Sequence, residues 1–226
     1  MMEISEIYNI LLEKFGKQGW WPILTRGYSE DNSIRELSEE ERFEISLGAI
    51  LTQNMAWKNV EKTLKKLRDN NFLDKDKLRD IDIKKLAEII KSSGYNNQKA
   101  KKIKEFIKFL DSGEEINREN LLNVWGIGKE TADSILLYAY REPIFVVDAY
   151  TKRIMDRIGY KENGYEELQN LFMNSISMDD KLFSEFHALF VEFGKNICKK
   201  EPLCEKCPLN SECDYLRNNS LAASDK

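Results

Sequence analysis

The chain has 226 residues, a length that accommodates one large or two small domains. Hydrophobic residues make up 42% of the sequence, which is enough for a core, and charged residues make up 33%. No apolar run approaches the ~20 residues of a membrane span, and the N-terminus lacks the apolar stretch of a signal peptide, so we expect a cytoplasmic protein without membrane contact. The net charge of −4 excludes a surface that is basic overall but not a local basic face.

The N-terminal segment predicts an amphipathic helix, since its apolar residues repeat with helical spacing: Ile4, Ile7, Tyr8, Leu11, Leu12 and Phe15. The loop that follows contains Trp20-Trp21-Pro22, half of the four tryptophans in the chain. A proline after two tryptophans favours an extended segment. The two rings could pack in a core or line the mouth of a pocket.

A capping box, Ser38 to Glu41, predicts the start of the next helix, whose apolar stripe is Phe43, Leu47, Ile50 and Leu51. That helix runs into Thr52-Gln53-Asn54, a polar turn that we expect to face solvent or a ligand. A further helix follows with the stripe Val60, Leu64 and Leu67. The charged stretch from Leu73 to Asp82 has the composition of a linker.

Leu86, Ile89 and Ile90 indicate a short helix that stops at Gly94. The next predicted helix buries Ala100, Ile103, Phe106, Ile107 and Leu110. This assignment leaves five lysines largely outside: Lys99, Lys101, Lys102, Lys104 and Lys108. Such a run forms either a solvated helix face or a set of phosphate contacts.

The segment from Val124 to Arg153 contains the main chemical signals. Gly126-Ile127-Gly128 predicts a tight turn that opens a helix, because Ala132, Ile135, Leu136 and Ala139 follow with helical spacing. Free N–H groups at such a helix start can bind phosphate. Eighteen residues after Glu130, the apolar run from Ile144 to Val147 ends at a single carboxylate, Asp148, which could cap the next helix, take part in chemistry, or do both.

The last long helix carries Leu182, Phe186, Leu189, Phe190 and Phe193, together with the only histidine of the chain, His187. A single histidine on an apolar helix is more often a core residue than a catalyst. Apart from Ile144 to Val147 the sequence contains no strand-like segment, so we predict an all-α protein.

All four cysteines lie within sixteen residues near the C-terminus: Cys198, Cys204, Cys207 and Cys213. Their close spacing in a protein expected to be cytoplasmic argues against disulfides and for a four-thiolate metal site. Zinc and a 4Fe–4S cluster both satisfy this chemistry.

The glycine turn, the Val-Asp-Ala-Tyr stretch at Asp148 and the four-cysteine loop, in this order, resemble the helix-hairpin-helix DNA glycosylases of the endonuclease III superfamily. The resemblance covers about Phe43 to Cys213. It implies a six-helix barrel domain of residues 34–142 and a helical iron–sulfur cluster domain of residues 1–33 plus 143–226. It also implies a 4Fe–4S cluster on the four cysteines, although the first gap is one residue shorter than in endonuclease III itself.

One departure from the family pattern concerns the reaction. In bifunctional members the residue two after the second hairpin glycine is a lysine that forms a Schiff base, and here that residue is Glu130. Lys129 points about 100° away on the helix. We therefore expect a monofunctional glycosylase without lyase activity, acting as a monomer on double-stranded DNA.

The chain is most similar to the 3-methyladenine DNA glycosylases of this superfamily, which share its Trp20-Trp21-Pro22, Leu51-Thr52-Gln53-Asn54 and Gly94-Tyr95 segments. The resemblance implies excision of alkylated purines with Asp148 as the catalytic carboxylate. A cationic purine is attracted to electron-rich rings, so the expected base pocket contains Trp20, Trp21 and Trp57, and Glu130 is assigned to the same pocket. The expected DNA contacts are Gln53, Tyr95, Gly126, Gly128 and Lys129.

Two alternatives stay open. A glycosylase for oxidised, deaminated or mismatched bases would be favoured by tryptophans that are buried in a core. A non-catalytic DNA-binding module would be favoured by an Asp148 that only caps its helix.

Overall fold

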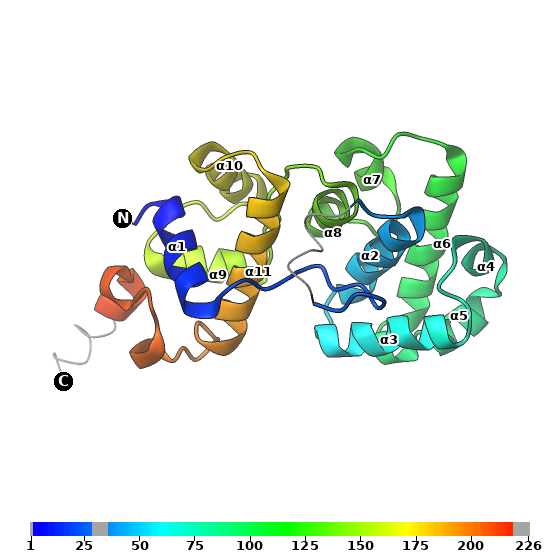
Figure 1. Cartoon of the computed structure of the whole chain (residues 1–226), viewed down its shortest axis with the longest axis horizontal. Coiled ribbons are helices and arrows are strands. Elements are labelled where there is room, and N and C mark those ends of the chain that lie inside the picture. Colours follow the sequence, from blue (N-terminus) through cyan, green and yellow to red (C-terminus); the bar gives the residue numbers. More distant parts are fainter. Residues whose placement is uncertain (1, 29–35, 219–226) are drawn as a thin grey trace. The chain divides into compact units, whose positions relative to one another are not determined.

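The structure is a computed structural model that describes residues 2–28 and 36–218, and it is all-α, as predicted (Figure 1). Within these ranges no strand forms, and a single isolated bridge joins Ile23 and Gly27. The segment from Ile144 to Val147 runs without regular secondary structure between two helices. None of the described helices combines the length and the apolar character that crossing a bilayer requires.

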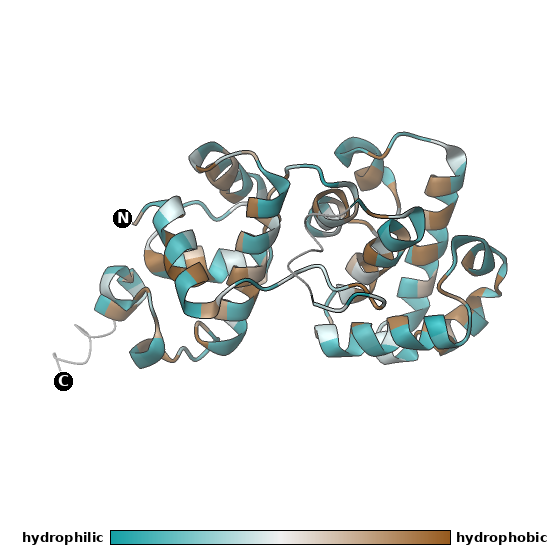
Figure 2. Cartoon of the chain, in the orientation of Figure 1, coloured by the Kyte–Doolittle hydropathy of each residue, from teal (hydrophilic) through white to brown (hydrophobic). Residues whose placement is uncertain are grey.

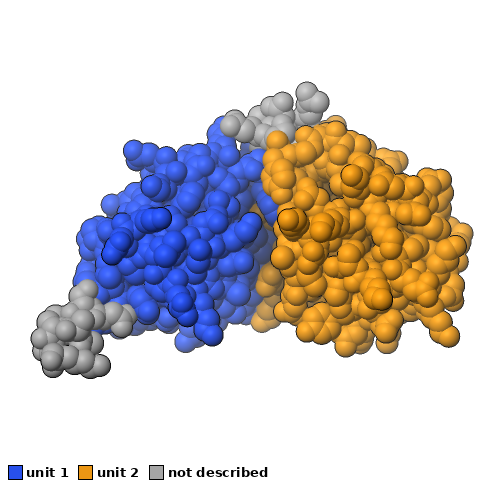
Figure 3. Space-filling view, turned by 90° about the horizontal axis from the view of Figure 1, so that it is seen from below, with its two compact units in different colours: residues 1–20, 29–33, 143–226 blue, residues 21–28, 34–142 orange. Residues whose placement is uncertain are grey.

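The chain forms two compact units, coloured separately in Figure 3. Unit 1 comprises residues 1–20, 29–33 and 143–226, and unit 2 comprises residues 21–28 and 34–142. The domain boundaries expected from the sequence, residues 34–142 and residues 1–33 plus 143–226, stay a prediction. Along the helices of each unit, apolar residues alternate with hydrophilic ones (Figure 2), the pattern of amphipathic helices that share a core.

Unit 2 is built around one buried helix. Its elements are α2 (Glu39–Thr52), α3 (Trp57–Asp69), α4 (Lys75–Asp80), α5 (Ile83–Ile89), the 3₁₀ turn η2 (Lys91–Ser93), α6 (Asn96–Ser112), α7 (Arg118–Asn123), α8 (Lys129–Ser134) and the π-helical turn η3 (Ile135–Ala139). Helix α2 is buried from Phe43 to Leu51 and contacts α3, α6, α8 and η3. Its predicted capping box is confirmed, since Ser38 and Glu41 exchange both hydrogen bonds.

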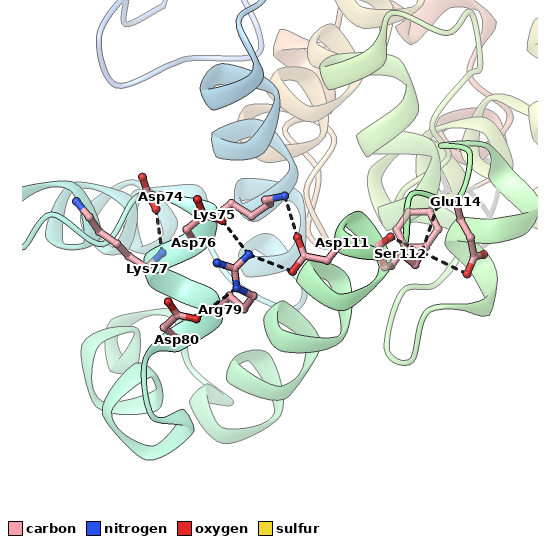
Figure 4. A network of polar contacts seen from close by, with 10 residues as sticks. Asp74, Lys75, Asp76, Lys77, Arg79, Asp80, Asp111, Ser112 and Glu114 are labelled. Carbon is pink, nitrogen blue, oxygen red and sulfur yellow. Dashed lines mark hydrogen bonds and ion pairs between the residues drawn. The ribbon is translucent and has the colours of Figure 1, made fainter.

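The charged stretch before α5 is not a linker, and that prediction was wrong. Asp74 caps α4 by accepting from the backbone N–H of Lys77 at 2.9 Å, and Leu78 is fully buried. Two ion pairs to Asp111 attach α4 to α6, from Lys75 at 2.8 Å and from Arg79 at 3.5 Å (Figure 4). One buried leucine and the Asp74 cap stabilise this short helix, and its high charge made the segment look like a linker in the sequence.

Helix α6 buries four residues of the predicted apolar stripe, Ala100, Ile103, Phe106 and Ile107, whereas the fifth, Leu110, is half-buried. The expectation that all its lysines lie largely outside was wrong for Lys99, whose exposed fraction is 2%, and Lys102 and Lys104 are half-buried.

Unit 1 has a phenylalanine-rich core around its last long helix. Its elements are α1 (Ile4–Phe15), α9 (Ala149–Ile158), α10 (Tyr165–Ser175), α11 (Asp180–Asn196) and the 3₁₀ turns η4 (Cys204–Lys206) and η5 (Asn210–Glu212). Helix α11 packs against α1 and α9. The rings of Phe145 and Phe172 stack at 4.0 Å, and those of Phe186 and Phe190 at 4.8 Å. This core holds the segment that leads into α9.

Candidate active site

Asp148 is the N-cap of α9 and is buried, with an exposed fraction of 8%. Its Oδ1 accepts from the backbone N–H of Thr151 at 2.7 Å and from the Thr151 hydroxyl at 2.9 Å. The capping function expected from the sequence is therefore confirmed. Because both bonds use Oδ1, capping leaves Oδ2 available for other interactions.

His187 of α11 lies on the other side of this carboxylate. It is buried, as predicted, and its Nε2 is 3.7 Å from Asp148 Oδ2. Burial alone raises the pKa of Asp148, but His187 and the two Thr151 bonds outweigh burial and hold this pKa below its ordinary value. Asp148 is thus ionised at neutral pH. Sequence reasoning treated His187 only as a core residue, because no local pattern connects it with a carboxylate 39 positions earlier.

The glycine turn joins α7 to α8 in unit 2, and Gly128 is the N-cap of α8, as predicted. Gly126 has a φ of 87°, which favours glycine. A Cβ at Gly126 would also lie 2.5 Å from Cγ of Lys102, so the lysine stem packs directly on the turn. Arg118 of α7 braces the two helices by donating from Nε and Nη2 to the buried carboxylate of Asp133 at 2.7 and 3.1 Å.

Gln53 contacts this turn through its side-chain amide. Its Nε2 donates to the Gly126 carbonyl at 3.1 Å and to the Thr131 hydroxyl at 2.9 Å, while Lys102 Nζ donates to its Oε1. The structure thus brings together two of the predicted DNA-contacting segments, the turn after α2 and the glycine turn. Lys102 was not singled out from the sequence among its lysine neighbours.

The other predicted site residues of unit 2 differ in exposure. Lys129, Glu130 and Tyr95 are exposed, and Tyr95 adopts a left-handed conformation with φ 45°. Trp57 is half-buried and meets the buried Trp21 edge-on, with ring centroids 5.1 Å apart. Trp21 also contacts Tyr138 at 5.1 Å. Trp21 is therefore a core residue of unit 2 that supports the ring of Trp57, while Trp20, which belongs to unit 1, is half-buried.

The four cysteines lie in unit 1 as free thiols, Cys198 and Cys213 buried and Cys204 and Cys207 half-buried. Burial raises the pKa of Cys207 to about 11, and it also raises that of Cys204; Cys198 and Cys213 raise both further. The four cysteines lie within sixteen residues of the sequence. Arg157 of α9 donates to Cys198 Sγ at 3.3 Å and to the Lys200 carbonyl at 2.8 Å, which anchors the start of this loop.

Four neighbouring thiols are a suitable donor set for zinc or an iron–sulfur cluster. In the described part of the chain, however, no three histidine, cysteine or acidic side chains converge closely enough to hold a metal ion. The four thiols are thus the right type of donor for a metal centre, but their side chains do not converge as the ligands of one ion do.

Comparison with known proteins identifies the family. The profile of the HhH-GPD superfamily of base excision DNA repair proteins matches residues 47–178, which include Gln53, the glycine turn and Asp148. The chain belongs to the HhH-GPD superfamily. It is accordingly a DNA repair glycosylase of the HhH-GPD/endonuclease III family.

Individual HhH-GPD relatives agree with this assignment. The chain is 40% identical to the Methanocaldococcus jannaschii protein "Putative DNA repair glycosylase MJ1434", over 93% of this chain and 95% of that protein. It is 32% identical to endonuclease III of Thermotoga maritima, over 81% of this chain and 87% of the relative. Among solved structures, H. pylori 3-methyladenine DNA glycosylase (MagIII) bound to 1,N6-ethenoadenine matches with a TM-score of 0.71 and 31% identity, covering 86% of this chain and 98% of that one.

Proposed function

We propose that this glycosylase is monofunctional and hydrolyses the N-glycosidic bond of alkylated purines such as 3-methyladenine in double-stranded DNA. The observation that carries the proposal is Glu130, an exposed carboxylate in the first turn of α8, where the family resemblance implies a lysine in lyase-active members. A carboxylate cannot form a Schiff base with the sugar. The 31% identity to the H. pylori 3-methyladenine DNA glycosylase supports the substrate class.

In this proposal Asp148 provides the charge for the reaction. A glycosidic bond breaks through a transition state that resembles an oxocarbenium ion, and a fixed carboxylate stabilises that positive charge and orients the attacking water. The low pKa of Asp148 keeps it ionised, and Oδ1 is held by the helix cap. A cationic base such as 3-methyladenine is already a good leaving group, so a strong general acid is not required.

The proposed base pocket uses aromatic rings. Trp20 and Trp57 are half-buried and would stack on a flipped cationic purine, whereas Trp21 supports Trp57 from the core. Glu130 is assigned to the pocket by the resemblance. Gln53 and Tyr95 would occupy the space left by the flipped base and separate the opposite strand, and Gly126, Gly128 and Lys129 would contact the DNA backbone.

We further propose that Cys198, Cys204, Cys207 and Cys213 hold a 4Fe–4S cluster with a structural role. When bound, the cluster would cross-link the loop and present its exposed lysines, Lys199, Lys200 and Lys206, to phosphate. Base hydrolysis needs no electron transfer, so no step of the reaction passes through it. Analysis of purified protein should give about four iron atoms per chain, and one zinc atom would contradict this assignment.

The test of the proposed function is base release from methylated duplex DNA in the presence of borohydride, which traps a Schiff base. We expect release of 3-methyladenine without a trapped adduct, and release that is slower by ~100-fold or more in Asp148→Asn. A trapped adduct in the wild type would show that another amine replaces the missing lysine and would refute the monofunctional assignment.

One observation favours a second candidate, a glycosylase for oxidised, deaminated or mismatched bases. Trp21 is buried against Trp57 and Tyr138, which reduces the aromatic surface available to a cationic base. The same assay with duplexes containing uracil, hypoxanthine or thymine glycol separates the candidates. Release of one of these bases with none from methylated DNA would establish the second.

A further inference from the structure

Lys99 in the first turn of α6 is a buried cation that the proposed reaction does not use. Its exposed fraction is 2%, and its Nζ donates to the Leu51 carbonyl at 2.7 Å and to the Ser93 carbonyl at 2.6 Å. Within the described chain no carboxylate forms an ion pair with it. Burying a charge without a counter-ion is unfavourable, so packing alone does not explain why the Lys99 ammonium group is buried at this place.

The two carbonyls come from the ends of two different elements. Leu51 lies in the last turn of α2 and Ser93 is the last residue of η2. Carbonyls at helix ends lack partners within the helix and carry partial negative charge. The Lys99 ammonium group therefore donates to one carbonyl at each of two helix ends and fixes the distance between these ends.

Each carbonyl lies two residues before a residue that we propose to contact DNA. Leu51 precedes Gln53 by two positions, and Ser93 precedes Tyr95 by two positions. A displacement of either carbonyl would thus move the turn that carries the corresponding side chain.

A second contact joins the same two turns. Gly94, with φ 64°, lies so close to Met55 that a Cβ on the glycine would be 2.5 Å from Met55 Cε. The hydroxyls of Thr63 and Ser92 are also 2.7 Å apart, which connects α3 to η2. The turns after α2 and before α6 are therefore packed together, with Lys99 as their buried polar connection.

We propose that Lys99 is a positioning residue for lesion recognition, which holds Gln53 and Tyr95 at the spacing needed to act together on a duplex. This inference rests on the proposed function, which assigns these two side chains to the gap and to the opposite strand. Lysine suits the role because its stem reaches both carbonyls from α6, whereas an apolar side chain would leave both unsatisfied.

The test uses DNA methylated as a duplex and assayed either annealed or as the isolated strand. Only the duplex has pairing and an opposite strand, so misplacement of Gln53 and Tyr95 should slow release from the duplex alone. We expect Lys99→Met to lower the ratio of duplex to single-strand release rates by ~10–100-fold, the effect of an ångström-scale misplacement. Gln53→Ala and Tyr95→Ala should lower it too. Lys108→Met is the matched control, since Lys108 is exposed on the same helix and pairs with Glu105, one turn before it.

A merely structural role would lower stability and both rates together, leaving their ratio unchanged, and this result would overturn the proposal. If Lys99→Met does not fold, Lys99→Gln is assayed instead, because its amide keeps a polar group in the site but is one bond too short to hold both carbonyls at their present spacing. A ratio within ~2-fold of wild type in Lys99→Gln would also overturn the proposal, whereas the 10–100-fold loss expected from misplacement would support it.

Failure of the proposed function gives a different result, namely no release of methylated bases by the wild type. The variants are then compared for binding to a duplex with an abasic-site analogue, relative to the isolated strand. Loss of the duplex preference in the Lys99 variant supports the positioning role, and its retention overturns it.

Discussion

Asp148 both caps α9 and is proposed to act on the substrate, and two isosteric substitutions separate these roles. Oδ1 accepts the two hydrogen bonds from Thr151, at 2.7 and 2.9 Å, and Oδ2 lies beside His187. Asparagine caps helices about as well as aspartate. In Asp148→Asn the amide oxygen can keep both Thr151 bonds, so we expect the free energy of unfolding to fall by less than ~1 kcal/mol.

Thr151→Val produces the complementary perturbation. It removes the hydroxyl bond to Oδ1, worth about 1 kcal/mol net, but it keeps the backbone N–H bond and the carboxylate. The two variants should thus be similarly stable in urea unfolding. Their single-turnover rates of base release should differ, with a loss of ~100-fold or more for Asp148→Asn, as for removal of a preorganised charge, and only a few-fold loss for Thr151→Val.

The control is Asp156→Asn, the same substitution at an exposed position of α9, which should leave both stability and rate unchanged. Equal rate losses in Asp148→Asn and Thr151→Val would refute the separation of roles and assign Asp148 to capping alone. Full activity of Asp148→Asn would refute its place in the reaction.

Three further predictions concern unit 2. Arg118→Met should lower the free energy of unfolding by ~3–5 kcal/mol in urea titration, because it removes the guanidinium from the fully buried carboxylate of Asp133; a loss below ~1 kcal/mol would contradict this. Gly48→Ala should cost ~1–3 kcal/mol and alter tryptophan fluorescence, since its Cβ would lie 2.8 Å from the Trp21 ring; an unshifted emission spectrum would show that the ring does not move. Burial lowers the pKa of Lys99 to about 8. Between this value and the pKa of ~10.4 in the unfolded chain, only the unfolded state keeps the proton, so the free energy of unfolding of the wild type should rise with pH. The difference in unfolding free energy between the wild type and Lys99→Met should therefore grow by about 1–2 kcal/mol from pH 7.5 to 9.5. A difference that does not change with pH would contradict the lowered pKa.

Features encoded by neighbouring residues were predictable from the sequence. The capping box at Ser38, the helix start at Gly128 and the cap at Asp148 each depend on residues no more than three positions apart, and all three are confirmed. The apolar stripe of α6 follows equally from helical periodicity. These signals define the helices and the ends that carry candidate site residues.

Features that depend on tertiary contacts were not predictable. Lys99 has the sequence context of an exposed lysine, and only the meeting of the ends of α2 and η2 makes it buried. His187 has the context of a core residue, and its position beside Asp148 depends on the packing of α11 on α9. In both cases the partner lies more than thirty positions away or is a backbone carbonyl, which leaves no pattern in the local sequence.

Helix α9 connects the two chemical features of unit 1. Its N-cap is Asp148, and in the middle of the helix Arg153 donates to the carbonyls of Cys198 and Gly194, both at 2.9 Å. Arg157, one turn later, holds Cys198 Sγ and the carbonyls that follow it. Because a helix moves as a rigid element, a displacement of the cysteine loop would also shift the Asp148 carboxylate at the start of α9. In the proposed reaction the four-cysteine loop therefore need not touch the substrate, because its part is to hold the helix whose N-cap is Asp148.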